Sequence, residues 1–109
     1  MKRFCLALDL KDDPVSIAAY DEYHKNVWPE IIESIRESGI RDMEIFRTGN
    51  RLFMIMEVEE NFSFEKKAAT DRDHPKVQEW NALMWTFLKP IQPGVKNWIL
   101  MEKVFGLNV

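Results

Sequence analysis

The middle of the chain carries a β-hairpin signal, and this signal constrains the fold more than any other feature of the sequence. Residues 40–47 and 51–59 are both rich in strand-forming side chains, and Thr48-Gly49-Asn50 separates them. A Gly-Asn pair between two apolar runs is typical of a tight hairpin turn. The chain therefore needs further elements that cover the apolar side chains of two adjacent antiparallel strands.

A strand and two helical pieces are predicted before the hairpin. Residues 2–10 alternate between apolar and other side chains with a period of two, which predicts a strand. Asp13 followed by a proline predicts a helix over residues 14–26. Pro29 disfavours helical geometry at the residue before it, so we expect a break there and a second helical piece that ends at Gly39.

The second half of the chain predicts two more helices and a last strand. Residues 62–72 predict a short helix, and Asp73 is placed to cap the next one. The apolar residues of that next helix fall within an arc of roughly 80°, which predicts that it packs on the sheet. These residues are Val77, Trp80, Met84, Phe87, Leu88 and Ile91. Prolines and a glycine within 90–94 end the helix, and residues 97–105 predict the last strand.

The resulting order, βαββαβ, is the ferredoxin-like arrangement of the α+β class, an antiparallel sheet with helices on one face. The 109 residues fit one domain, 1–109, without repeats or linkers. The opposite sheet face stays uncovered, and the third strand is apolar on both sides because Phe53 and Ile55 alternate with Met54, Met56 and Val58. An exposed apolar sheet favours association, so we expect a homodimer packed sheet on sheet.

Charge and composition exclude several classes of function. Lys plus Arg is 15 and Asp plus Glu is 18, and the resulting net charge of −3 argues against nucleic-acid or membrane partners. No apolar run is long enough to span a bilayer, and acidic residues interrupt the first apolar stretch too early for a signal peptide, so we expect a cytoplasmic protein. A single cysteine, Cys5, and scattered glycines predict neither a metal centre nor a nucleotide cofactor.

The two histidines are the side chains whose ordinary pKa lies nearest neutrality. His74 precedes a proline in a polar segment, which favours a solvated loop residue. His24 follows Tyr20 by four residues, so both side chains leave the same face of a helix, close to Tyr23 and Trp28. From the residues alone, this cluster is either an amphipathic edge of the core or the lining of a site that uses His24 as an acid/base.

The segment Tyr-Asp-Glu-Tyr-His-Lys-Asn-Val-Trp-Pro-Glu, residues 20–30, resembles the signature of the L-rhamnose mutarotase family. The resemblance continues through residues 50–53, 71–80 and 101–105 and so covers nearly the whole chain. It implies a dimeric α/β barrel of ferredoxin-like subunits and an isomerase that interconverts the α and β anomers of a monosaccharide without a cofactor. It also implies that His24 is the catalytic acid/base and that Tyr20 binds the sugar.

Two positions depart from the family pattern and bear on the sugar. The family has a tyrosine early in the second strand and paired tryptophans on the last helix, whereas this chain has Met43, and Trp80 followed by Asn81. The resemblance therefore implies a 6-deoxyhexose substrate, with L-fucose ahead of L-rhamnose. We expect Asn81 to present its amide to a sugar hydroxyl, and Trp80 either to pack on the sugar ring or to fill the core. Trp85 and Trp98 are expected in the core or the dimer interface.

Two other classes of function are consistent with the sequence. One is a cofactor-free monooxygenase of the related dimeric barrels, which also use an aromatic pocket and a histidine on a helix. The other is a non-catalytic module that binds a sugar or only dimerises. Oxygen uptake with a phenolic substrate identifies the first class, and a sugar that binds while its anomers relax at an unchanged rate identifies the second.

Overall fold

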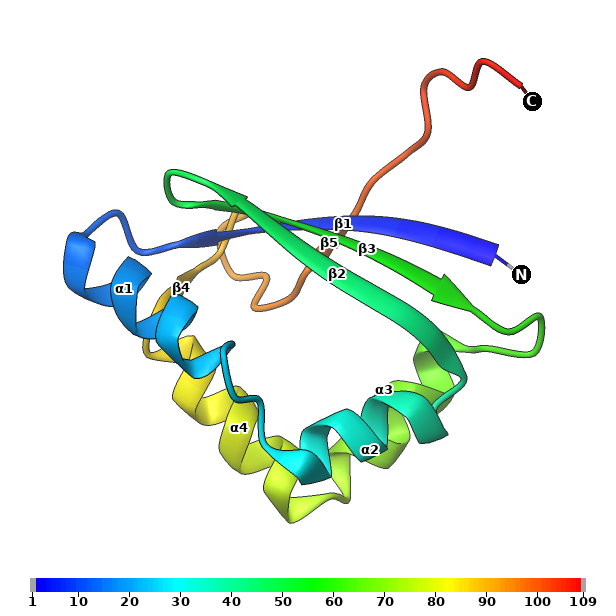
Figure 1. The fold of residues 1–109 in the computed structure, drawn as a ribbon, viewed down its shortest axis with the longest axis horizontal. Helices are drawn as coiled ribbons and strands as arrows, with labels where there is room; N and C mark the ends of the chain where they lie inside the picture. Colours follow the sequence, from blue (N-terminus) through cyan, green and yellow to red (C-terminus); the bar gives the residue numbers. More distant parts are fainter. Residues whose placement is uncertain (1, 109) are drawn as a thin grey trace.

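Residues 2–108 are described by a computed structural model, in which the helices lie on one side of an antiparallel sheet (Figure 1). The elements are β1 (Lys2–Leu10), α1 (Pro14–Tyr23), α2 (Pro29–Glu37), β2 (Ile40–Thr48), β3 (Arg51–Val58), α3 (Phe64–Arg72), α4 (Pro75–Trp85), β4 (Leu88–Lys89) and β5 (Ile99–Leu100). The strand order is β2-β3-β1-β4, and β5 also pairs with β1. The predicted ferredoxin-like α+β fold is confirmed.

Local signals in the sequence explain where most elements begin and end. The Asp13 carboxylate accepts a hydrogen bond of 2.8 Å from the backbone N–H of Ser16 and so caps α1. Gly39 ends α2 with φ +94°, and Gly49 turns the β2–β3 hairpin with φ +56°. Both glycines occupy the left-handed region that other residues rarely adopt. The strands and helices before residue 60 therefore follow the predicted order.

Two helix ends differ from the prediction. α1 ends at Tyr23, earlier than expected, because His24 occupies the C-cap and its backbone N–H still bonds to the Tyr20 carbonyl at 3.2 Å. α4 is capped by His74 and not by Asp73, since Nδ1 of His74 accepts from the backbone N–H of Val77 at 3.4 Å. His74 is therefore a half-buried capping residue, and the prediction of a solvated loop histidine was wrong.

α4 also ends before the last residues of its predicted apolar arc. The Thr86 hydroxyl donates to the Leu83 carbonyl at 2.6 Å and closes the helix at Trp85. The Phe87 carbonyl then accepts from the backbone N–H of Lys11 at 2.8 Å, and β4 pairs with the end of β1. Pairing with the open edge of β1 satisfies backbone groups that a longer helix would leave unpaired on the sheet.

The last strand is shorter than predicted. β5 covers only Ile99–Leu100, opposite Ala7 and Leu6, and Met101 adds one backbone hydrogen bond of 2.8 Å to Cys5. Residues 102–108 form no strand and extend away from the rest of the molecule (Figure 1). Val104 is 95% exposed. The alternating pattern of this segment is that of a strand, but residues 2–108 offer it no further neighbour to pair with.

The two faces of the sheet carry different residues and differ in burial. The face toward the helices is buried and carries Leu6, Leu8, Leu10, Leu52, Met54, Met56 and Val58. Met54 and Met56 therefore both point inward, and neither belongs to the open face. The outer face, as we name it, is the other side of the sheet. Its apolar residues Cys5, Ala7, Phe46, Phe53 and Ile55 sit opposite one another in the register of β1, β2 and β3, and Glu44 lies opposite Ile55 at the β2 edge. Ion pairs border this outer face, Arg3 with Glu57 at 3.5 Å and Arg51 with Asp9 at 2.7 Å.

None of the helices within residues 2–108 combines the length and the hydropathy required to cross a bilayer.

Candidate functional site

A cavity of about 970 Å³ lies between the inner face of the sheet and the helices. Its wall takes side chains from β1, β2 and β3 and from each of the four helices. All five residues predicted for the site line it: Tyr20, His24, Met43, Trp80 and Asn81. The fold thus gathers around one cavity residues that are far apart in the sequence.

His24 is held by the end of its own helix. Its Nδ1 atom lies 2.8 Å from the backbone carbonyl oxygen of Tyr20, one turn earlier in α1. A carbonyl oxygen can only accept, so Nδ1 carries the proton, and Nε2 of the neutral ring is left as a proton acceptor. The imidazole also stacks on the Tyr20 ring, with centroids 4.1 Å apart. These two contacts fix both the tautomer and the orientation of the ring.

The environment of His24 favours the uncharged imidazole. Burial lowers the pKa of His24 below its ordinary value of 6.5, and this effect outweighs the opposing effects of the Tyr20 carbonyl and the Asp21 carboxylate. At neutral pH the ring is therefore mostly neutral. A neutral imidazole with a fixed tautomer can take a proton at Nε2 and return it, which is what general acid/base catalysis requires.

Tyr20 contributes a hydroxyl to the cavity. The residue is only 4% exposed, and burial raises the pKa of its phenol. The phenol therefore stays protonated at neutral pH. Its hydroxyl makes no hydrogen bond to the rest of residues 2–108. A neutral hydroxyl without a protein partner is suited to bond with a polar ligand.

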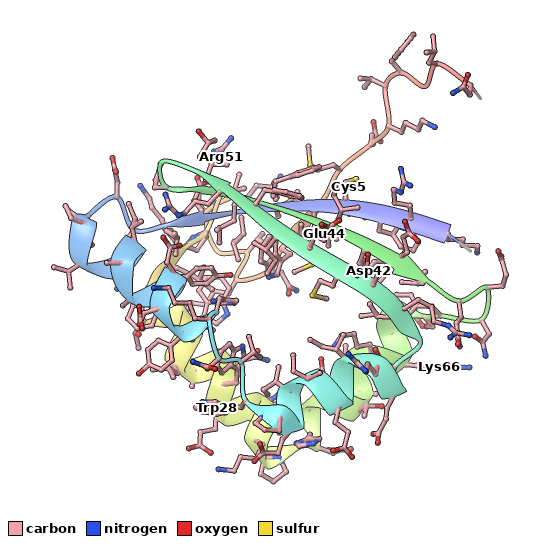
Figure 2. The ribbon with its side chains drawn as sticks, in the orientation of Figure 1. Cys5, Trp28, Asp42, Glu44, Arg51 and Lys66 are labelled. Atoms are coloured by element: carbon pink, nitrogen blue, oxygen red, sulfur yellow. The ribbon has the colours of Figure 1, made fainter. Side chains whose placement is uncertain are left out.

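Trp80 connects the helices behind His24. Its indole meets the rings of His24, Trp28 and Tyr23 edge to face, with centroids 5.6, 5.1 and 6.3 Å away. Trp80 is 7% exposed and belongs to the core, and it also lines the cavity. Figure 2 shows Trp28 at the junction of α1 and α2. The two predictions for Trp80, a core residue or a residue of the site wall, are thus compatible, because one indole fills the core and forms part of the cavity wall.

Met43 and Asn81 face the cavity from β2 and α4. Met43 is half-buried against the second core cluster, whereas Asn81 is exposed. The wall contains many residues that were not predicted for the site, among them Trp85, Asn97 and Trp98. Trp85 and Trp98 pack on the core, as expected, but they also reach the cavity. Sequence patterns could not reveal this, because an aromatic residue at the margin of a core has the same periodicity as one inside it.

No group of three or more His, Cys, Asp or Glu residues that could hold a metal ion occurs in the described part of the chain.

Comparison with known proteins identifies relatives of the whole chain. The family model described as L-rhamnose mutarotase matches residues 3–107. The chain is 43% identical over 113 residues to the L-fucose mutarotase of Xanthomonas campestris pv. campestris, with 99% of this chain and 90% of the relative covered. It is 32% identical over 99 residues to the L-rhamnose mutarotase of Bacillus subtilis, with 82% and 86% covered.

The fold also has a solved counterpart. The crystal structure of an L-rhamnose mutarotase from Formosa agariphila superimposes with a TM-score of 0.74 over 98% of this chain and 99% of that one, at 22% sequence identity. At this identity the likeness bears on the fold. The family model, by contrast, spans the hairpin, the aromatic cluster around His24 and the start of α4 together. On this evidence the chain belongs to the L-rhamnose mutarotase family.

Proposed function

We propose that this protein interconverts the α and β anomers of a 6-deoxyhexose, with L-fucose preferred over L-rhamnose. Family membership supports the reaction, and the relative that shares 43% of its residues is named an L-fucose mutarotase. The single observation that carries the proposal is the arrangement of His24, a neutral imidazole bonded through Nδ1 to the Tyr20 carbonyl at 2.8 Å on the wall of an aromatic cavity.

The chemistry needs one proton taken from the C1 hydroxyl and one delivered to the ring oxygen. The C1–O5 bond then breaks and gives an open-chain aldehyde, which rotates about C1–C2. Ring closure on the other face of the carbonyl reverses both proton transfers and yields the other anomer. Electrons, phosphate and metal ions do not enter this balance. A group that exchanges protons near neutral pH is sufficient, and we assign this role to Nε2 of His24.

The other residues of the cavity bind the sugar in this proposal. The Tyr20 hydroxyl, which has no partner in the rest of residues 2–108, bonds to a sugar oxygen. Trp80 supplies an apolar wall for the C–H face of the ring, and the Asn81 amide both donates to and accepts from hydroxyls. Met43 contributes an apolar and adaptable thioether.

We further propose that the protein acts in the cytoplasm as a homodimer that joins two outer faces. Phe46 is 51% exposed on this face and lies opposite Phe53 in the register of β2 and β3. The bordering ion pairs, Arg3–Glu57 and Arg51–Asp9, carry both signs of charge. An apolar centre with a polar rim is the usual composition of a protein interface. A two-fold axis would place each outer face against its own copy.

Saturation-exchange NMR tests the proposed reaction. Irradiation of the α-anomer H1 resonance should reduce the β-anomer signal of L-fucose in the presence of catalytic amounts of protein, and L-rhamnose should respond less. His24→Ala serves as the inactive control. A sugar that binds while its anomers exchange at the uncatalysed rate would identify a binding module. Oxygen uptake with a phenolic substrate would identify the monooxygenase class. Either result would refute the proposal.

A further inference from the structure

Helix α3 turns a polar face toward the cavity. The residues of α3 that line the cavity are Phe64, Glu65, Lys67, Ala68 and Asp71, and all but Glu65 are spaced by three and four residues on one side of the helix. Lys66 lies instead at the outer edge of the molecule (Figure 2). A helix that only closes a core normally presents apolar residues to it. This face instead carries a cation, Lys67, and near the end of the helix a carboxylate, Asp71.

The two oxygens of the Asp71 carboxylate have different surroundings. Oδ2 accepts from Nζ of Lys67 at 2.7 Å. Oδ1 is inaccessible to solvent and has no hydrogen-bond partner within residues 2–108. Buried polar atoms in folded proteins are nearly always bonded, and an ionised carboxylate can only accept. The surroundings of Oδ1 therefore lack a donor. Because Asp71 lines the cavity, a rotation of its carboxylate would bring Oδ1 within reach of a ligand hydroxyl.

Asp71 is held next to the part of α4 that carries the predicted sugar-binding residues. Its backbone carbonyl accepts from Nε2 of Gln78 at 2.8 Å and from the backbone N–H of His74 at 3.2 Å. Asn81 lies three residues beyond Gln78, which is about 4.5 Å of helix rise. Asp71 therefore lies in the cavity wall, with its backbone held against the first turns of α4.

We propose that Asp71 is a substrate-binding residue that helps to select the sugar, and that its Oδ1, turned into the cavity, accepts a hydrogen bond from a ring hydroxyl. The ligand named here rests on the proposed function. Lys67 holds the carboxylate through its other oxygen, Oδ2, and the bond of a carboxylate to a hydroxyl is charge-assisted. L-Fucose and L-rhamnose differ in the orientation of the hydroxyls at C2 and C4. An acceptor at one place in the wall therefore meets a hydroxyl donor in one sugar and a C–H bond in the other, and this discriminates between them.

The first test compares Asp71→Asn with Asp73→Asn, a matched change two residues further on at the exposed end of α3. Asp71→Asn should raise KM for L-fucose about 10- to 100-fold, the range for loss of a hydrogen bond to a charged group. Its kcat should change less than about threefold, because the bond exists in both ground state and transition state. Asp73→Asn should leave both constants unchanged. An unchanged KM in a folded Asp71→Asn variant would overturn the proposal.

The second test identifies the hydroxyl. Binding of L-fucose and of its 2-deoxy and 4-deoxy analogues is measured by tryptophan fluorescence for the wild type and for Asp71→Asn. The wild type should bind the analogue that lacks the contacted hydroxyl at least tenfold more weakly than it binds L-fucose. Asp71→Asn should bind that analogue and L-fucose with about equal affinity. This non-additivity is the signature of a direct contact, which a purely structural role does not produce. Additive losses would refute the contact.

The same measurements separate this inference from the proposed function. Binding that depends on Asp71 without anomer exchange would refute the mutarotase activity and support the Asp71 contact. Catalysed anomer exchange, together with additive losses of affinity from the variant and the deoxy analogue, would support the mutarotase activity and refute the Asp71 contact. If Asp71→Asn does not fold, NMR of the wild type provides the readout. The ¹³C carboxyl resonance of Asp71 is assigned by its absence from the spectrum of Asp71→Glu. It should move when L-fucose is added, and a resonance that stays in place at saturation would overturn the contact.

Discussion

Nδ1 of His24 lies 2.8 Å from the backbone carbonyl oxygen of Tyr20, and the two rings stack with centroids 4.1 Å apart. One residue thus orients the other twice, through its backbone and through its side chain. The backbone contact depends only on the end of α1, because the carbonyl of a last-turn residue has no further helical donor for its second lone pair. The tautomer of His24 is therefore set by helix geometry and does not require a neighbouring carboxylate.

Replacement of His24 should abolish most of the catalysis. His24→Ala is expected to slow enzyme-dependent anomer exchange by about two to four orders of magnitude, which is the usual contribution of a general acid/base. His74→Ala is the control, because His74 only caps α4 through a long contact of 3.4 Å to the Val77 N–H. It should lose about 0.5 kcal/mol of stability, the low end for an N-cap, and keep its activity. Equal activities of the two variants in saturation-exchange NMR would place the site elsewhere.

The rate should depend on pH through His24. Because burial lowers the pKa of His24 below 6.5, the ring is neutral at pH 7 and the proton acceptor is available. The acid limb of kcat/KM should therefore have its midpoint below 6.5, with a plateau above it. A midpoint above 6.5 in a pH series of exchange rates would contradict the assignment of His24 as the base.

The free energy of unfolding should also depend on pH through His24. The folded-state pKa of His24 is lower than its unfolded value, so protons bind preferentially to the unfolded chain. The corresponding stability is present above pH 6.5 and is lost as the pH falls through the folded-state pKa. Urea unfolding at pH 7 and pH 5 should show a smaller difference for His24→Gln than for the wild type. Identical differences would mean that the ring is not buried as a neutral group.

Tyr20→Phe separates the hydroxyl from the ring. The ring should remain stacked on His24, and the removed hydroxyl has no hydrogen bond to lose within residues 2–108. Stability should therefore stay within about 0.5 kcal/mol of the wild type. KM for L-fucose should rise about 3- to 10-fold, the contribution of a neutral hydrogen bond to the sugar. A destabilised protein with normal KM would show that the hydroxyl serves the fold.

The homodimer is tested on the outer face. Phe53→Lys or Ile55→Lys places a charge among the apolar side chains of this face and should yield a monomer or an aggregate, because the charge would be desolvated in the interface. Val15→Lys on α1 is the matched control, since Val15 is 78% exposed on a different element. Sedimentation velocity at micromolar concentration distinguishes the states, and a monomeric wild type would refute the dimer.

The choice of sugar is tested at two lining positions. Met43 and Asn81 stand where the family pattern has a phenol and an indole, and both reach the cavity. The wild type should exchange the anomers of L-fucose faster than those of L-rhamnose. The double variant Met43→Tyr, Asn81→Trp should partly reverse this order, because an unpaired buried hydroxyl costs about 1–3 kcal/mol. A preference of the wild type for L-rhamnose would show that these two positions do not select the sugar.

The order of elements could be predicted from the sequence because it depends on short-range signals. The hairpin at Gly49, the cap at Asp13 and the end of α2 at Gly39 each follow from the residues at that place. The predicted ends of α4 and of the last strand were wrong for a different reason. Whether Leu88 continues a helix or pairs with Leu10 depends on a strand that is distant in the sequence.

The sequence by itself determined the fold class and the candidate pair Tyr20–His24, because periodicity, turn residues and helix spacing are local properties of the chain. Only the tertiary structure decided which side of β3 is buried, that Trp80 serves both core and cavity, and that Asp71 faces the same space. The physical reason is that burial and the loss of a hydrogen-bond partner depend on what other segments bring close. A local pattern allows several such arrangements, and the packing of α3 and α4 against the sheet selects one.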